Sequence, residues 1–302
     1  MESKRLDLKG KRFPIACHWE ITYRCNLNCA MCYTNSRNTP EQISEELSTA
    51  EIFRILDELT QAGCLELTLT GGEPLARPDF LEIYQRAASK GFLITLFTNA
   101  TLLDKRALDA FKSYPPYLIE ISLHGVTPST FESVTRKKDS FAKCMSAIKE
   151  LHKNHFNLLL KATATTLNKA EVLAVKNYAQ TLEDVRFILG EELRESLDSA
   201  QNLLRFQLSN EELDKIEAAD PDITREVCNS TTAPVGSCLA GKHFFHLDAY
   251  GALQLCSLHR KESYDLRKGN LLEGFYQHLP AFSCPLKETD SHTRSVPEAC
   301  DV

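Results

Sequence analysis

Short strand-like segments alternate with longer helix-like segments over the first 190 residues of this 302-residue chain. The predicted strands are rich in β-branched and aromatic residues and span residues 13–22, 65–70, 92–98, 117–123, 157–163 and 185–189. The helices predicted between them span residues 48–63, 78–90, 104–113, 140–154 and 169–182. Strands joined through helices form right-handed βαβ units, so this alternation predicts an α/β fold with a parallel sheet.

Capping signals mark several of these helices. Ser48, followed three residues later by Glu51, forms a capping box, and Gly63 is expected to end the same helix. Ser140 is expected to cap the helix that it opens. Beyond the last predicted strand the chain becomes acidic, and a further helix is expected to begin after Ser209.

Three cysteines follow the first predicted strand with the spacing C-x3-C-x2-C, at Cys25, Cys29 and Cys32. Three thiolates on one short loop can surround one metal centre. A cubane iron–sulfur cluster that is held by three thiolates keeps one iron open to another ligand. A structural zinc site needs four protein ligands, and the nearest histidine, His18, lies upstream on the strand. A zinc knuckle and ordinary reduced thiols are the alternative interpretations.

A second motif, Gly71-Gly72-Glu73-Pro74, follows the second predicted strand, and Tyr33 follows the third cysteine. Alone, Gly-Gly-x-Pro is typical of a turn. Together with the cysteine spacing, it resembles the radical S-adenosylmethionine (SAM) superfamily. The resemblance implies a partial (β/α)6 TIM barrel in which the three cysteines bind a 4Fe-4S cluster and its open iron chelates SAM. A doubly wound sheet is the alternative, but no G-x-G-x-x-G follows the first strand.

The resemblance also implies which residues contact SAM. The Gly-Gly-Glu-Pro motif is expected to line the methionine amino group, Tyr33 to pack against adenine, and Arg136 to bind the carboxylate. Asn99 and Ser122 at the ends of the third and fourth strands are further candidate contacts. Without the family, each of these residues has an ordinary interpretation as a turn, capping or core residue. His124, directly after the fourth strand, is either a substrate contact or a structural histidine, and Lys161 on the fifth strand is a candidate second cation inside the barrel.

The chain contains eleven cysteines, a high count that indicates more than one cysteine site. Cys17, Cys64 and Cys144 are isolated among apolar residues and are expected to be small core residues. The last quarter of the chain carries five more: Cys228, Cys238, Cys256, Cys284 and Cys300. In a reducing cytosol, metal ligation or free thiols are expected rather than disulfides.

Residues 244–256 predict a β-hairpin that turns at residues 248–251 and brings Cys238 and Cys256 together. The spacing resembles the opening of the SPASM and twitch auxiliary-cluster domains. That resemblance implies an auxiliary 4Fe-4S cluster with Cys284 and Cys300 as further ligands. The dense final cysteine run of SPASM domains is missing, so a truncated, twitch-like domain with one cluster is expected, and free thiols are the alternative. Cys228 is either a hydrogen donor to a substrate radical or a spare loop cysteine.

Composition limits the partners and organisation of the chain. A net charge of −6 and a pI of about 5.9 give no basic field for nucleic acid or an anionic membrane. No signal peptide and no run of 18 apolar residues occur, so a cytoplasmic protein is expected. The change in composition near residue 220 predicts three parts: an N-terminal segment (1–14), the radical SAM barrel (15–220) and the auxiliary-cluster domain (221–302).

The resemblance implies an enzyme that reductively cleaves SAM to a 5′-deoxyadenosyl radical, which abstracts a hydrogen from its substrate. Flavodoxin or ferredoxin is the expected type of reductant. Segments around the Gly-Gly-Glu-Pro motif and at the ends of the third and fourth strands look most like SPASM maturases that modify ribosomally made peptides, so a peptide substrate is expected. A separate leader-peptide recognition protein is a further candidate partner. The alternatives are a small-molecule dehydrogenase or epimerase of aminocyclitols or sugars, and a non-enzymatic zinc-binding module.

Overall fold

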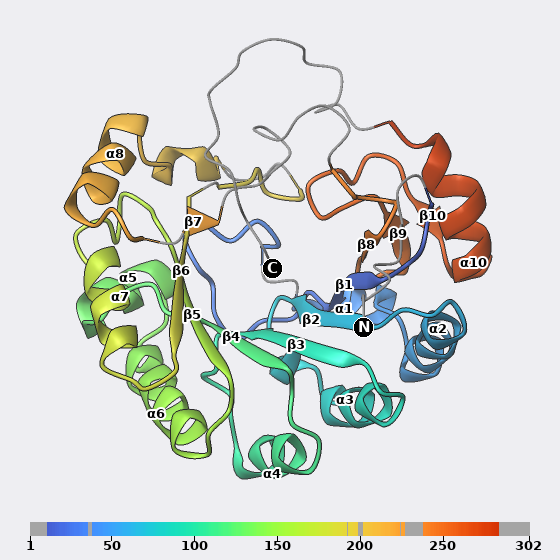
Figure 1. Cartoon of the computed structure of the whole chain (residues 1–302), viewed down its shortest axis with the longest axis horizontal. Helices are drawn as coiled ribbons and strands as arrows, with labels where there is room; N and C mark the ends of the chain where they lie inside the picture. The colour runs from blue at the N-terminus through green and yellow to red at the C-terminus, as the bar shows by residue number, and fades with distance from the viewer. Residues whose placement is uncertain are drawn as a thin grey trace, which may run out of the picture.

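The computed structural model describes residues 11–35, 38–191, 193–198, 202–223, 225–226 and 238–283. These residues form one curved sheet with helices packed on its outer face (Figure 1). The strands are β1 (Ala16–Thr22), β2 (Glu66–Gly71), β3 (Leu93–Thr98), β4 (Leu118–Ser122), β5 (Leu158–Thr163), β6 (Arg186–Gly190), β7 (Arg225–Glu226), β8 (Phe244–Leu247), β9 (Ala252–Gln254) and β10 (Tyr264–Asp265).

The strand order in the sheet is β10-β9-β8-β1-β2-β3-β4-β5-β6-β7. Strands β1 to β6 are neighbours in chain order, and each pairs in parallel with the next. At one edge β7 continues the parallel pairing. At the other, β8 pairs in parallel with β1 and is followed by antiparallel β9 and β10. Six successive parallel strands with helical crossovers form a partial barrel, and this prediction is confirmed.

The helices cover the convex side of the sheet, as Figure 1 shows for α2, α3, α4, α6 and α7. Their bounds are α1 (Pro40–Glu45), α2 (Thr49–Gln61), α3 (Phe80–Ser89), α4 (Lys105–Ser113), α5 (Pro128–Thr135), α6 (Ser140–Lys153), α7 (Val172–Gln180), α8 (Asn210–Ala219) and α10 (Leu271–Glu273). The capping boxes at Ser48 and Ser209 are confirmed. Ser140 as a cap is wrong, because Asp139 occupies the N-cap and the Ser140 hydroxyl donates backwards to the Lys137 carbonyl at 2.6 Å.

Successive residues on the barrel strands face opposite sides of the sheet. The residues that face the helices are apolar and at most 2% exposed: Leu67, Leu69, Ile94, Leu96, Ile119, Ile121, Leu158 and Leu160. Cys17, Cys64 and Cys144 are buried within the same core, as predicted. The alternate positions carry mostly polar side chains into the barrel interior, where the candidate site lies.

The predicted C-terminal hairpin is confirmed as β8 and β9. Asp248 fixes its turn, because its carboxylate accepts hydrogen bonds from the backbone N–H groups of Tyr250 at 2.9 Å and Ala252 at 2.8 Å. The hairpin extends the barrel sheet, since Ala16 of β1 pairs with Phe244 of β8. The domain boundary near residue 220 stays a prediction.

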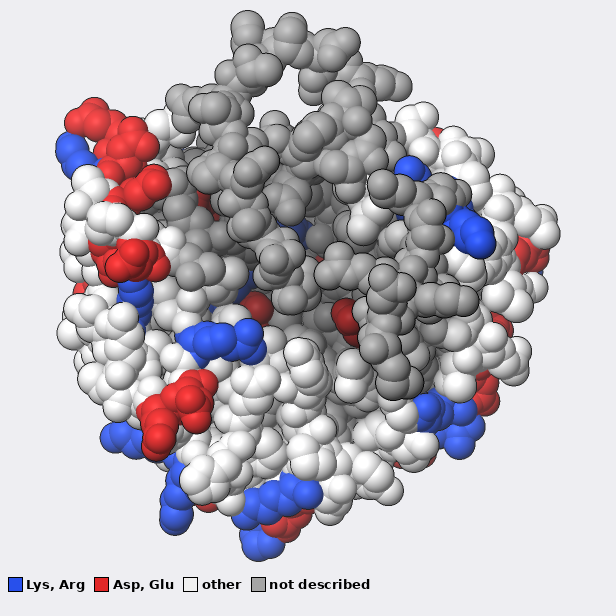
Figure 2. Space-filling model, in the orientation of Figure 1, with Lys and Arg blue, Asp and Glu red and all other residues white. Residues whose placement is uncertain are grey.

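Charged side chains of both signs are spread over the described surface that Figure 2 shows, with no continuous basic patch on that face. Acidic side chains gather over α8, which carries Glu211, Glu212, Asp214 and Glu217. Among the described helices, none has both the length and the apolar character that a membrane crossing requires.

Candidate active site in the barrel

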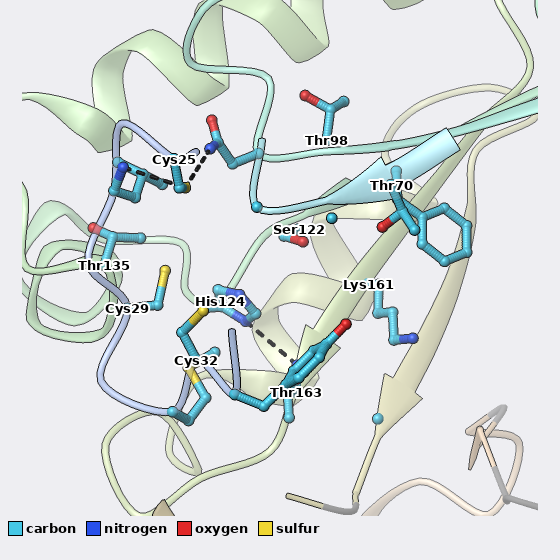
Figure 3. Close-up of a pocket in the computed structure, with 18 of the residues that line it drawn as sticks. Cys25, Cys29, Cys32, Thr70, Thr98, Ser122, His124, Thr135, Lys161 and Thr163 are labelled. Atoms are coloured by element: carbon cyan, nitrogen blue, oxygen red, sulfur yellow. Dashed lines mark hydrogen bonds between the residues drawn. The ribbon is translucent and has the colours of Figure 1, made fainter. Parts of the chain in front are cut away.

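A cavity of about 290 Å³ lies inside the barrel at the carboxyl ends of β1 to β6. Each of these strands, or the loop that follows it, contributes to the wall, as expected for the functional end of a parallel barrel. The wall includes Thr70, Thr98, Ser122, Thr163 and Gly190 at or near strand ends. The hydroxyl groups of Thr70, Thr98, Ser122 and Thr163 are therefore available to a ligand in this cavity (Figure 3).

The three cysteines of the loop after β1, Cys25, Cys29 and Cys32, all line this cavity (Figure 3). Burial raises the pKa of the Cys29 thiol, and the neighbouring Cys32 and Cys25 raise it further. Three thiolates this close together need a positively charged centre to balance them. Within the described part of the chain, no group of three or more His, Cys, Asp or Glu side chains is arranged to hold a single metal ion. An all-thiolate donor set is the one that iron–sulfur clusters use.

Hydrogen-bond donors surround these sulfur atoms. The hydroxyl of Thr34, which is 1% exposed, lies 3.1 Å from Cys32 Sγ. Cys25 Sγ accepts a hydrogen bond from the Leu27 backbone N–H at 3.4 Å and lies 3.9 Å from the side-chain amide nitrogen of Asn99. Such donors stabilise negative charge on a thiolate and so suit a metal-ligating role.

Gly71 and Gly72 hold the end of β2 against the segment that leads into the cysteine loop. Gly72 N donates to the Thr22 carbonyl at 2.8 Å, and Glu73 N donates to the Arg24 carbonyl at 2.7 Å. Gly71 has a φ of +130°, and a Cβ added there would lie 2.0 Å from Thr22 O. A Cβ on Gly72 would lie 2.3 Å from Arg24 O. Only glycine allows this backbone contact, and both glycines also line the cavity.

Glu73 is fully buried and is not among the residues that line the cavity. Its carboxylate accepts hydrogen bonds from the Leu75 backbone N–H at 3.1 Å, the Thr98 hydroxyl at 2.7 Å and the Asn99 backbone N–H at 2.7 Å. Burial raises the pKa of Glu73 to about 7, although these hydrogen bonds oppose the shift. Pro74 is also buried, at the start of a short 3-10 turn outside the cavity wall.

The other predicted SAM contacts are divided between the cavity and the surface. Asn99 and Ser122 line the cavity, and the Asn99 amide also donates to Asn26 at 3.1 Å. Arg136 is exposed and ends α5 in the left-handed conformation, with a φ of 53°. It does not line the cavity, and its charge only partly offsets the rise that burial causes in the Cys29 pKa. Contact between SAM and any of these residues stays a prediction.

Glu120 of β4 and Lys161 of β5 form an ion pair on the wall of the cavity, with an O–N distance of 3.6 Å. The Lys161 ammonium also lies 5.9 Å from the ring centre of Phe97. His124 accepts a hydrogen bond at Nδ1 from the Thr163 N–H at 3.4 Å, and burial together with Lys161 lowers its pKa to about 4. His124 is therefore neutral, with its proton on Nε2. Glu120 was not predicted, although a charged residue inside an apolar strand was a visible signal.

Sequence reasoning also missed a buried network around Glu20 of β1, which is 0% exposed. Arg260 donates two hydrogen bonds of 2.7 Å, one to each carboxylate oxygen of Glu20. The hydroxyls of Tyr33 and Tyr23 donate to the same carboxylate at 2.5 Å and 2.7 Å, and His246 Nε2 lies 3.3 Å from it. Burial alone would raise the Glu20 pKa, but His246 and Arg260 hold it well below its usual value.

Cys238 and Cys256 are half-buried and lie on either side of the β8–β9 hairpin. A Cβ added to Gly241 would lie 2.4 Å from the side chain of Leu255, so the segments that carry the two cysteines run beside each other. Three predicted site residues lie outside the described residues: Cys228, Cys284 and Cys300.

The family model of the radical SAM superfamily matches residues 19–172, which include the cysteine loop and strands β2 to β5. The chain belongs to the radical SAM superfamily. Membership implies a 4Fe-4S cluster and SAM as cofactors, and the thiolate loop described above fits such a cluster.

Several curated proteins are similar to this radical SAM chain. AdoMet-dependent heme synthase of Methanosarcina barkeri is 30% identical over 56% of this chain and 48% of its own length. The subtilosin biosynthesis protein AlbA of Bacillus subtilis is 26% identical over 92% of this chain and 62% of its own. PqqA peptide cyclase of Ruegeria pomeroyi is 32% identical over 56% of this chain and 46% of its own length. The chain thus spans about half the length of the curated relatives it matches.

Solved structures share the fold. The crystal structure of Streptococcus suis SuiB bound to precursor peptide SuiA matches with a TM-score of 0.70, at 15% identity, over 91% of this chain and 66% of that chain. At this identity the likeness establishes the architecture, namely the radical SAM partial barrel.

Proposed function

We propose that this protein is a radical SAM enzyme that modifies a peptide substrate. The observation that carries the proposal is the convergence of Cys25, Cys29 and Cys32 on one cavity at the carboxyl ends of the barrel strands. In the proposal these cysteines ligate the 4Fe-4S cluster. When bound, the cluster and SAM supply one-electron chemistry that yields a carbon radical able to abstract hydrogen.

The chain's own residues bind and orient these groups. The backbone of Gly71 and Gly72 lines the cavity beside the cysteine loop, so we propose that it faces the amino-acid portion of SAM. The Glu73 carboxylate ties the end of β2 to the end of β3 through its hydrogen bonds with Thr98 and Asn99. Asn99 and Ser122 offer amide and hydroxyl groups to the ribose or carboxylate. The exposed Arg136 is the least well placed of the predicted contacts.

The names of two relatives support a peptide as substrate, since one is a peptide cyclase and another acts in bacteriocin biosynthesis. The heme synthase relative supports a small-molecule substrate instead, and its match covers only about half of this chain. The match to the bacteriocin protein extends over 92% of the chain and includes the C-terminal region. We therefore favour the peptide.

The first experiment measures 5′-deoxyadenosine after anaerobic reconstitution with iron and sulfide, reduction with dithionite and addition of SAM. We expect the wild-type protein to form it and a Cys29→Ala variant to form none. Cys144→Ala is the matched control, because this thiol is buried in the helix-facing core and does not line the cavity. A wild-type protein that binds iron but cleaves no SAM would contradict the proposal.

The peptide assignment has its own test. A low-molecular-mass extract of the source organism is expected to stimulate 5′-deoxyadenosine formation, and treatment of the extract with protease should abolish the stimulation. Stimulation that survives protease would favour the small-molecule alternative of a dehydrogenase or epimerase.

We also propose an auxiliary 4Fe-4S cluster with Cys238 and Cys256 among its ligands, supported by the adjacent course of their two segments. The test is the iron content of a variant in which Cys25, Cys29 and Cys32 are all alanine. About four irons per chain would support the auxiliary cluster. Iron near zero would make the C-terminal region a folded cover without a cofactor.

A further inference from the structure

Two guanidinium groups lie over the ring of Tyr33 at the wall of the cavity. The Arg194 and Arg260 guanidinium carbons lie 5.2 Å and 5.5 Å from the ring centre, which is within the range of cation–π contact. The Tyr33 hydroxyl donates to Glu20 at 2.5 Å, and its carbonyl accepts from Leu197 N at 2.8 Å. Tyr33 is thus fixed at its ring, its hydroxyl and its backbone.

Arg260 organises this arrangement from a distant part of the chain. It follows β9 by six residues, and its Nε donates to the Ser257 carbonyl at 2.7 Å. The Ser257 hydroxyl also accepts from Arg194 at 3.0 Å, so one short loop positions both cations beside the ring. Because the Arg260 fork binds both oxygens of Glu20, the planar group cannot rotate away from Tyr33 without breaking two charged hydrogen bonds.

The network has a direct connection to the cysteine loop, since Tyr33 is covalently joined to Cys32. Both residues line the cavity, and the network reaches them from the strand β1 side of the barrel. Simple core packing does not require a buried carboxylate with four polar neighbours, because burying a charge is unfavourable unless it is fully paired. We therefore infer that this network serves to fix the orientation of the Tyr33 side chain and not only to stabilise the fold.

We propose that Arg260, held by Glu20, is a positioning residue that fixes Tyr33 and through it the Cys32 end of the cysteine loop, which would hold the cluster beside bound SAM. The inference rests on the proposed function. It also gives the C-terminal region a role in SAM binding that does not depend on an auxiliary cluster. The ligand class is SAM itself, and Tyr33 and Arg260 control how tightly it binds.

The test uses two variants that remove the same chemical group from the same carboxylate. Tyr33→Phe deletes the hydroxyl bonded to Glu20 on the cavity side. Tyr23→Phe deletes the other phenolic hydroxyl bonded to Glu20, which also accepts a hydrogen bond from Arg260 at 3.0 Å. This variant leaves both Arg260–Glu20 hydrogen bonds in place, and Tyr23 does not line the cavity and packs against Tyr250 instead. Each full-length variant is reconstituted anaerobically and reduced. The readout is the SAM concentration that gives half of the maximal change in the EPR spectrum of the reduced cluster.

We expect Tyr33→Phe to raise this concentration about tenfold, the factor that corresponds to about 1.4 kcal/mol of binding free energy. Tyr23→Phe should titrate like the wild type. Arg260→Lys keeps a positive charge near Glu20 but loses the planar fork, so it should shift the titration in the same direction as Tyr33→Phe. If Arg260→Lys fails to fold, the two phenylalanine variants still decide the question.

Two results would overturn the inference: a wild-type titration for Tyr33→Phe, or an equal shift for both phenylalanine variants. The second result would mean that the Glu20–Arg260 network as a whole, and not the position of Tyr33, controls SAM binding. A wild-type protein without any SAM-responsive EPR signal would instead refute the proposed function, and this inference with it.

Discussion

Substituting Gly72 by alanine tests how the end of β2 is attached to the cysteine loop. The added Cβ would lie 2.3 Å from Arg24 O and 2.8 Å from Tyr23 O, and these backbone atoms can yield only if the chain moves. Movement would break the backbone hydrogen bonds from Gly72 to Thr22 and from Glu73 to Arg24. Two hydrogen bonds at about 1 kcal/mol each, plus about 1–2 kcal/mol of steric strain, predict a loss of about 3–4 kcal/mol in the free energy of unfolding.

Urea unfolding measures this loss, and the iron content after anaerobic reconstitution reports whether the displaced loop still holds its cluster. We expect a lower urea midpoint together with reduced iron. Gly91→Ala is the control, because Gly91 has a φ of +86° but nothing within 4 Å of its added Cβ. Backbone strain alone should cost the control about 1 kcal/mol and leave the iron unchanged. A Gly72→Ala protein with wild-type stability and full iron would refute the packing argument.

Three further predictions concern other parts of the barrel. Because burial raises the Glu73 pKa to about 7, folding favours the protonated form of this side chain. The free energy of unfolding should therefore fall by up to about 3 kcal/mol as the pH rises from about 5 to 8. Urea unfolding of Glu73→Gln should lack this pH dependence, and a flat wild-type profile would contradict the prediction. Thr34→Val removes the hydroxyl beside Cys32 Sγ and should lower the reduction potential of the bound cluster by several tens of millivolts. Thr34→Ser keeps a hydroxyl and should keep the wild-type potential. A redox titration that finds an unchanged potential in the valine variant would exclude this role. Phe245→Ala leaves a cavity at a fully buried site against Phe275 and should lower the free energy of unfolding by about 3–5 kcal/mol. Unfolding should remain one cooperative transition, and a separate early transition would show that the hairpin unfolds independently of the barrel.

Local signals predicted the barrel strands and most of their helices because these elements carry their own periodicity and caps. The helices α1 and α5 were missed. Both are short and begin at a proline, Pro40 and Pro128, each preceded by a threonine cap. Proline in a polar segment is also typical of a loop, so the sequence alone did not separate the two interpretations.

In the candidate site, too, only the residues that are close in sequence could be predicted to lie together. Cys25, Cys29 and Cys32 lie within one loop, so their spacing was sufficient to predict that they share a site. The Glu20–Arg260 pair joins residues 240 positions apart, and neither residue has a neighbour that indicates the other. Only the pairing of β8 with β1 brings the arginine to the carboxylate, and that pairing is a tertiary event without a local signal.

The position of β8 also has a consequence for how the protein folds during synthesis. β1 leaves the ribosome before the other described strands, and its neighbour on one side, β2, follows within 50 residues. Its neighbour on the other side is residues 244–247, so that edge of β1 stays without its native partner until more than 200 further residues have been translated. Unpaired strand edges promote association between chains, and contacts of such large sequence separation form slowly. We therefore expect fragments that stop before residue 244 to aggregate, even though they contain the entire cysteine loop.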